Sequence, residues 1–180
     1  WEDTQELTFD AHYIFVKGGT LSIGTPEDPH ENKLTITLHG IKEDMTLPGF
    51  GNKLIGVLDG KIDIHGKKRS RTWGLLKQTA NKGSNTITIE SDIDWQVGEE
   101  IIIAPTSTRK EFEIRRIASI SGGTITLDKP LNFSHIAETL TYDGKPYEVR
   151  GEVGLMTRNV LIRGDELSAK NKYGFHIMLR

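Results

Sequence analysis

Three stretches of the sequence decide the fold: GGTLSIG (18–24), DGKIDIHG (59–66) and GGTITLD (122–128). In each, glycine precedes alternating apolar and polar residues, and LTITLHG (34–40) and NVLIRG (159–164) end in the same way. Alternation with a period of two buries one face of a strand, and the trailing glycines allow corners with positive φ. This weak internal repeat predicts either the coils of a β-solenoid or roll, or hairpins in a β-sandwich.

The composition narrows the classes of protein that the chain can belong to. Its 180 residues allow one domain or two small ones. Lys and Arg number 23 against 25 Asp and Glu, a balance that argues against a nucleic-acid partner. The longest apolar run, Ile101 to Ala104, is far too short to span a membrane. The chain contains no Cys, which excludes disulfides, thiolate metal sites and cysteine nucleophiles.

Short strand-like runs separated by Gly, Asn, Asp or Pro continue along the chain and predict an all-β fold. One stretch departs from this pattern: TWGLLKQTA (72–80) predicts one or two turns of helix with Thr72 as N-cap. The inward strand residues should form the core. They are Ile14, Val16, Leu21, Ile23, Ile36, Leu38, Leu54, Val57, Ile62, Ile64, Trp73, Leu76, Ile87, Ile89, Trp95, Ile101, Ile103, Ile117, Ile125, Leu127, Val160 and Ile162.

Several side chains have a chemical and a structural interpretation. Asp63 and His65 share a strand face and could transfer a proton, although we favour a structural interpretation, with a turn at Asp59-Gly60 and a glycine corner after His65. Asp92 and Asp94 could contribute to a Ca²⁺ site, or could bind backbone amides in a turn. Trp95 could stack on a sugar or pack into the core.

The remaining sequence shows no metal or nucleophile motif. The six histidines have no metal-binding spacing, so we expect no metal and no cofactor. Charged residues are dense near the carboxyl terminus, where they could line a groove or form cross-strand ion pairs. They are Glu148, Arg150, Glu152, Arg158, Arg163, Asp165, Glu166 and His176. Asn132-Phe133-Ser134 is an N-glycosylation acceptor pattern.

A series of motifs resembles one known family. They are YIFVKGGTLSIGTPEDP (13–29), LTITLHG (34–40), LPGFGNKLIGVLDGKIDIHGKKRSRTW (47–73), DWQVGEEIIIAPT (94–106), ITLDKPLNFSH (125–135) and EVRGEVGLMTRNVLIRGDE (148–166). Their order and spacing resemble the G-eight (eight-glycine) domain, found in fibrocystin, fibrocystin-like proteins and two hyaluronidases. GSNTITIESDIDWQVGEEIIIA (83–104) makes the chain more similar to the fibrocystin-like branch.

The resemblance implies an all-β fold: a roll of short strands with one short helix, running into a right-handed parallel β-helix. It implies two domains. Residues 1–147 would be the eight-glycine-type domain, truncated at its N-terminus, and residues 148–180 the first coils of a β-helix continuing downstream.

The leading functional hypothesis is an extracellular structural or adhesion module of a larger fibrocystin-like protein, secreted or at the cell surface. Its partners would be glycan or extracellular protein, with Glu148, Arg150 and Glu152 as ligand-binding residues and Asn132 glycosylated. Membrane contact would come only through other parts of the parent protein. The alternative is a hyaluronidase-like enzyme cleaving acidic polysaccharide, using Arg158, Arg163, Asp165 and His176.

Overall fold

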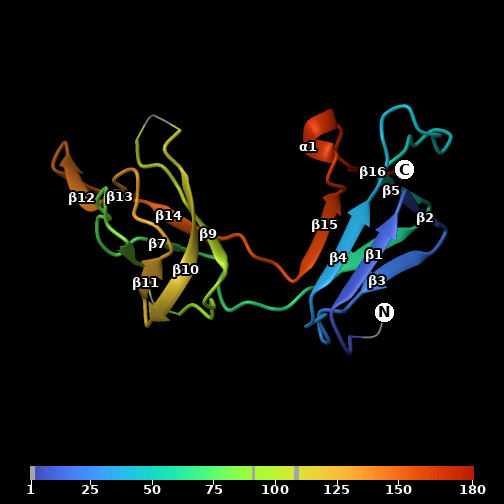
Figure 1. The fold of residues 1–180 in the computed structure, drawn as a ribbon. Helices are drawn as coiled ribbons and strands as arrows, with labels where there is room; N and C mark the ends of the chain where they lie inside the picture. Colours follow the sequence, from blue (N-terminus) through green and yellow to red (C-terminus); the bar gives the residue numbers. More distant parts are fainter. Residues whose placement is uncertain (1–2, 91, 108–109) are drawn as a thin grey trace. The chain divides into compact units, whose positions relative to one another are not determined.

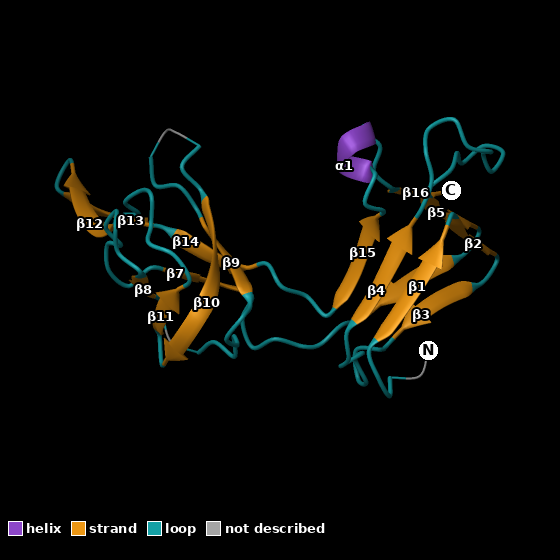
Figure 2. Ribbon diagram, viewed as in Figure 1, coloured by secondary structure: helices purple, strands orange, loops and turns teal. Residues whose placement is uncertain are grey.

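A computed structural model describes residues 3–90, 92–107 and 110–180, and the chain in it is all-β, as predicted. Its contacts divide the chain into two compact units. Unit 1 combines residues 1–68 with 158–180, and unit 2 is residues 69–157. Figure 1 follows the chain along its length and Figure 2 shows how strands dominate both units.

Unit 1 is built from three passes of the chain, laid side by side in parallel. The first pass holds β1 (Leu7–Ala11), β2 (Tyr13–Lys17) and β3 (Thr20–Ile23). The second holds β4 (Leu34–Leu38), β5 (Leu54–Leu58) and β6 (Lys61–Ile64), and the third holds β15 (Val160–Gly164) and β16 (His176–Leu179). The resulting sheets have the orders β1-β4-β15, β16-β5-β2 and β3-β6, and all their pairings are parallel.

The core of unit 1 follows from strict register between equivalent strands. Leu34 of β4 lies opposite Leu7 of β1 and Val160 of β15, and Ile36 and Leu38 continue the inward face. These three β4 side chains are fully buried. Burying a Leu or Ile side chain stabilises a fold by about 1.5–3 kcal/mol, so the central strand accounts for much of the hydrophobic stabilisation of this sheet.

Because of the third pass, the division between the two units does not lie at the expected boundary, residue 147. β15 and β16 complete the sheets of the first two passes, so residues 158–180 pack with residues 1–68. Unit 2 is therefore inserted between the second pass and the third. The pairing partners are more than a hundred residues apart, and local sequence patterns carry no record of such pairings.

Unit 2 is a curled antiparallel sheet of six strands with a hairpin attached. The six are β7 (Trp73–Leu75), β14 (Glu152–Leu155), β9 (Glu100–Ile103), β10 (Glu113–Ser121), β11 (Thr124–Leu127) and β8 (Thr86–Thr88), in that order across the sheet. A bridge between Leu76 and Ile89 joins the two outer edges, so the sheet curls on itself. The hairpin pairs β12 (Ala137–Tyr142) with β13 (Lys145–Arg150). The buried cluster inside includes Ile101, Ile103 and Trp95.

The helix predicted over residues 72–80 is wrong. Trp73–Leu75 form β7, which pairs with β14, and the Thr72 carbonyl accepts a hydrogen bond from the Leu155 amide instead of beginning a helix. Leu76 and Ala80 are buried as strand-edge residues, whereas Trp73 is 55% exposed and is not core. Tertiary pairing outweighs a weak local helix preference here. The helix that the described chain does contain is α1 (Ser168–Asn171), in the third pass of unit 1.

Candidate functional site

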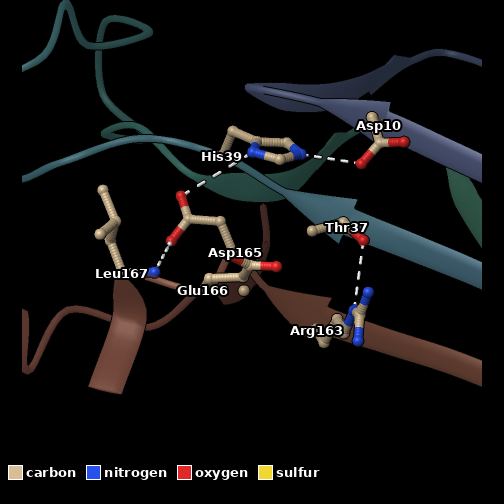
Figure 3. Close-up of a pocket in the computed structure, with 8 residues that line it drawn as sticks. Asp10, Thr37, His39, Arg163, Asp165, Glu166 and Leu167 are labelled. Atoms are coloured by element: carbon tan, nitrogen blue, oxygen red, sulfur yellow. Dashed lines mark hydrogen bonds and ion pairs between the residues drawn. The ribbon is translucent and has the colours of Figure 1, made fainter. Parts of the chain in front are cut away.

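A polar pocket of about 500 Å³ lies where β1, β4 and β15 end in unit 1. We call it the β4-end pocket, and Figure 3 shows its side chains. Its lining residues are Asp10, Thr37, His39, Arg163, Gly164, Asp165, Glu166 and Leu167. Leu167 supplies the one large apolar side chain of this lining, and six of the eight lining residues have charged or hydrogen-bonding side chains.

Strand register places a row of polar side chains across β1, β4 and β15, near the ends of these strands. Asp10 of β1 and Arg163 of β15 both lie directly opposite Thr37 of β4. Ile36 and Leu38 point into the core, so Thr37 and its two neighbours occupy the opposite face. Adjacent strands are about 4.8 Å apart, and the Arg163 Nε donates to the Thr37 hydroxyl at 3.3 Å. Asp10, Thr37 and Arg163 are the polar row.

His39 follows β4 directly and lies between two carboxylates. Its Nε2 is 2.8 Å from Asp10 Oδ1, and its Nδ1 is 4.0 Å from Asp165 Oδ2 (Figure 3). An ionised carboxylate only accepts hydrogen bonds, so Nε2 carries the proton that points at Asp10. The Nδ1 distance exceeds that of a hydrogen bond. In the neutral ring, Nδ1 therefore offers a lone pair to the pocket.

Asp165 is held in place by several donors. Lys53 Nζ lies 2.9 Å from Oδ1, the Gly40 amide donates to Oδ2 at 3.0 Å, and the Ser168 hydroxyl donates to Oδ1 at 3.1 Å. Partial burial raises the pKa of Asp165, but the hydrogen bonds from Lys53, Gly40 and Ser168 outweigh burial and lower that pKa to about 2. Asp165 is therefore ionised at any physiological pH. Its hydrogen bonds with Lys53 and Gly40 anchor the third pass to the second.

Lys53 is the buried centre of that anchor, with a side chain only 1% exposed. Besides Asp165, three acceptors surround its ammonium: the Gly40 carbonyl at 3.1 Å, the Ser168 hydroxyl at 2.8 Å and the Tyr173 carbonyl at 3.2 Å. The three N–H donors of the ammonium are shared among these four groups. A buried charge is tolerated when it is paired and hydrogen-bonded. This cluster joins the second pass to the segment that follows β15.

The structure brings together two of the four residues assigned to the enzyme alternative. Arg163 and Asp165 line the β4-end pocket. Arg158 lines a different pocket of about 360 Å³, together with Lys67 and Asn159. His176 belongs to β16, and its Nε2 is 3.2 Å from the Phe50 carbonyl. These four residues therefore do not converge on one pocket.

The residues predicted to bind a ligand lie in unit 2. The Arg150 guanidinium is 2.8 Å from Glu90 and 3.0 Å from Glu148, and its Nε donates to the Leu76 carbonyl at 2.6 Å. The two carboxylates raise the pKa of Arg150. Glu152 is exposed on β14. Arg150 thus holds the hairpin against the curled sheet, and ligand binding by these residues stays a prediction.

Asn132 is exposed, as a glycan acceptor must be, while its backbone amide binds the buried Glu113 carboxylate at 2.8 Å. Burial raises the pKa of Glu113, but the Asn132 and Phe133 amides, His135 and Arg115 outweigh it, so the pKa is lowered. Glu113 therefore fixes the loop that presents Asn132. Glycosylation there stays a prediction.

The other candidates take structural positions. Trp95 is 2% exposed and donates from Nε1 to the Arg71 carbonyl at 2.8 Å, so its core interpretation is confirmed. Asp63 and His65 are 2.8 Å apart, as their shared face predicted. Within residues 3–90, 92–107 and 110–180, no group of three or more His, Asp or Glu side chains could hold a metal. In the same residues, no helix is long and apolar enough to cross a membrane.

The sequence patterns do not single out Asp10, Thr37, His39 or Lys53. A signal for two of these residues, Asp10 and Thr37, is nevertheless present. LTFDAH (7–12), LTITLHG (34–40) and VLIRGD (160–165) align without gaps, and this alignment places Asp10, Thr37 and Arg163 at one position. The strand at residues 7–11 is not among the predicted strands, so the sequence alone does not indicate the polar row. The local sequence gives no sign that Lys53 is buried, because lysine is almost never fully buried unless it is paired.

Comparison with known proteins finds one matching family and several proteins that are similar over most of the chain. The family described as "G8 domain" matches residues 1–77. Fibrocystin-L of Mus musculus is 42% identical over 91% of this chain, and fibrocystin-L of Homo sapiens is 40% identical over 94%. The chain spans about 4% of the length of each. Protein rliB of Dictyostelium discoideum is 30% identical over 96% of this chain and 15% of its own.

Among solved structures, the tailspike gp61 of Pseudomonas phage phi297 matches with a TM-score of 0.42. The identity is 16%, over 93% of this chain and 25% of the tailspike. The family match and the fibrocystin-L relatives confirm the resemblance predicted from the sequence: residues 1–77 match the G8 domain family, and the chain is similar to the fibrocystin-like proteins over most of its length.

Proposed function

We propose that the chain is a non-enzymatic, extracellular module of a larger fibrocystin-like protein, secreted or at the cell surface, and that it contacts glycan through the β4-end pocket. The three parallel passes of unit 1 would be coils of a right-handed β-helix that presents this pocket on one face. The supporting observation is the polar row, which aligns a carboxylate, a hydroxyl and a guanidinium across three strands beside His39.

The lining favours glycan over a protein partner. Energetically dominant contacts between proteins cluster around buried aromatic and apolar anchors. The β4-end pocket offers one leucine among charged and hydroxyl groups. Its polar groups instead suit a ligand covered with hydroxyls, and a protein partner would be an alternative outcome of the binding test.

Glycan cleavage is the second candidate, because Arg163 and Asp165 share the pocket. Asp165 is poorly suited to be its general acid, since donors surround its oxygens and its pKa is about 2. A general acid must hold a proton near the working pH. We therefore favour binding without cleavage, with Asp165 as an anchor.

Sizing of glycans after incubation with the chain separates the two candidates. Sized hyaluronan and neutral polysaccharides are incubated with and without Ca²⁺ and examined by gel filtration. We expect the polymers to keep their length. Reproducible shortening that Asp165→Ala or Arg158→Ala abolishes would establish the enzyme instead, whereas shortening that survives both changes would point to other residues.

A further inference from the structure

At the surface of the β4-end pocket, negatively charged groups outnumber positively charged ones. Asp10 has a side chain that is 59% exposed, and Glu166 is also exposed. Arg163 is the one cation of the lining, because Lys53 is buried behind Asp165. Lys53 and Asp165 neutralise each other, so the exposed Asp10 and Glu166 carboxylates face the single charge of Arg163 and leave an excess of one negative charge when His39 is neutral. An approaching ligand therefore meets more negative than positive charge.

This excess works against an acidic ligand. A carboxylate or sulfate entering the pocket would lie beside Asp10 or Glu166, and like charges brought together in an interface disfavour binding. Arg163 offers partial compensation only, because its single positive charge faces the carboxylates of both Asp10 and Glu166. Hyaluronan and similar polymers carry such a group in every repeat, so they fit poorly.

The hydrogen-bonding groups also work against a simple cation. Asp10, Glu166 and the Nδ1 of neutral His39 accept hydrogen bonds, while the terminal nitrogens of Arg163 donate. Among the described residues these nitrogens make no hydrogen bond to protein. An ammonium group only donates and would leave Arg163 unsatisfied, whereas an anion only accepts and would leave the carboxylates unsatisfied. A hydroxyl both donates and accepts, so adjacent hydroxyls satisfy both kinds of group.

Resting on the glycan contact proposed above, we infer that the β4-end pocket binds an uncharged, hydroxyl-rich saccharide and rejects acidic ones. Asp10 and Glu166 accept from ligand hydroxyls, and Arg163 donates to a hydroxyl or ring oxygen. The ring of His39, oriented by Asp10, adds an acceptor at its Nδ1. The polar row thus sets the preference for uncharged ligands.

Titration followed by NMR tests the inference on the isotopically labelled 180-residue chain. The probes are neutral oligosaccharides of glucose, galactose, mannose and N-acetylglucosamine, compared with hyaluronan oligosaccharides of matched length. We expect at least one neutral probe to shift the amide signals of residues 37–40 and 163–167. Hyaluronan should leave these signals unchanged at the same concentration.

Variants then assign the contact to the pocket. Arg163→Gln and Asp10→Asn should each weaken binding of the neutral probe about tenfold, the loss expected when one hydrogen bond to a charged group is removed. Arg116→Gln is the matched control, because Arg116 is an exposed arginine of unit 2 that pairs with Glu100. It should leave the affinity unchanged. Asp10→Asn combined with Glu166→Gln should allow hyaluronan to bind.

The outcomes separate this inference from the proposed function. Hyaluronan binding at residues 37–40 and 163–167 of the unchanged chain would overturn the inference while leaving glycan contact in place. A lack of shifts with every saccharide would overturn both. Binding of a neutral probe that the Arg163 and Asp10 changes leave unaltered would place the glycan elsewhere and overturn the inference alone.

Discussion

Lys53 Nζ lies 2.9 Å from Asp165 Oδ1 and connects the second pass of unit 1 to the segment after β15, 112 residues later in the chain. The lysine is almost fully buried and the carboxylate is 12% exposed. Water screens such a pair much less than an exposed one. The pair therefore both anchors the third pass and keeps Asp165 ionised beside the pocket.

Removing the negative charge of this pair should destabilise unit 1 strongly. Asp165→Asn leaves the Lys53 ammonium buried without a counter-charge, which costs about 3 kcal/mol or more. Urea unfolding followed by circular dichroism measures the change. The control is Arg116→Gln, which breaks an exposed pair and should cost about 0.5 kcal/mol. Equal losses in the two variants would contradict the anchoring role of Asp165.

The same pair should make stability depend on pH in the acid range. The pKa of Asp165 is about 2 in the folded chain, below its ordinary value of 3.8. A lowered folded-state pKa contributes stability above the unfolded pKa and loses it as pH falls. The stability advantage of the wild-type chain over Asp165→Asn should therefore shrink between about pH 4 and pH 2. Urea midpoints measured across this range check it, and a constant difference would speak against the ion pair.

The central strand of unit 1 should be sensitive to truncation. Ile36 is fully buried between β1 and β15, so Ile36→Ala should cost about 3 kcal/mol through lost burial and the cavity left behind. Leu161→Ala removes a side chain of β15 that is 43% exposed and should cost much less. Thermal unfolding of both variants gives the comparison. A loss at Leu161 as large as that at Ile36 would show that the inward face is misassigned.

Unit 1 should fold without the inserted unit. The Lys67 amide donates to Asn159 Oδ1 at 2.8 Å, so the points where the chain leaves and re-enters unit 1 are neighbours. Replacing residues 69–157 by a short Gly/Ser linker should preserve the three parallel passes. NMR spectra of the shortened chain should keep dispersed signals for residues 34–38 and 160–164. A collapsed spectrum would mean that unit 1 depends on unit 2.

The sequence predicted the parts of this fold that local alternation determines. Alternation predicts that Ile36 and Leu38 lie in the core, because alternating residues share a face, and both are fully buried. The prediction for Trp73 is wrong because three residues of β7 are too few for a period to show, and pairing with β14 decides their conformation. Strand existence was thus predictable where the pattern was long enough.

The site was less predictable because it depends on contacts between distant segments. Arg163 and Asp165 are recognisable as charged residues in a strand-like stretch, yet Asp10 and His39 complete the pocket from 124 to 155 residues away along the chain. The burial of Lys53 depends on Asp165 and Tyr173, which no local pattern connects to it. Register between the passes, rather than composition, creates the arrangement.

The insertion of unit 2 has a consequence for the order of events during synthesis. β4 can pair with β1 as soon as both leave the ribosome, but its second neighbour, β15, begins at Val160. Ribosomes add about 5–20 residues each second, so the far edge of β4 waits for roughly 6–25 s. An open strand edge is a template for pairing with another chain. Nascent chains of this protein therefore pass through an interval in which a hydrophobic strand is half-paired, and slow translation or a chaperone at this edge would govern the yield of folded protein.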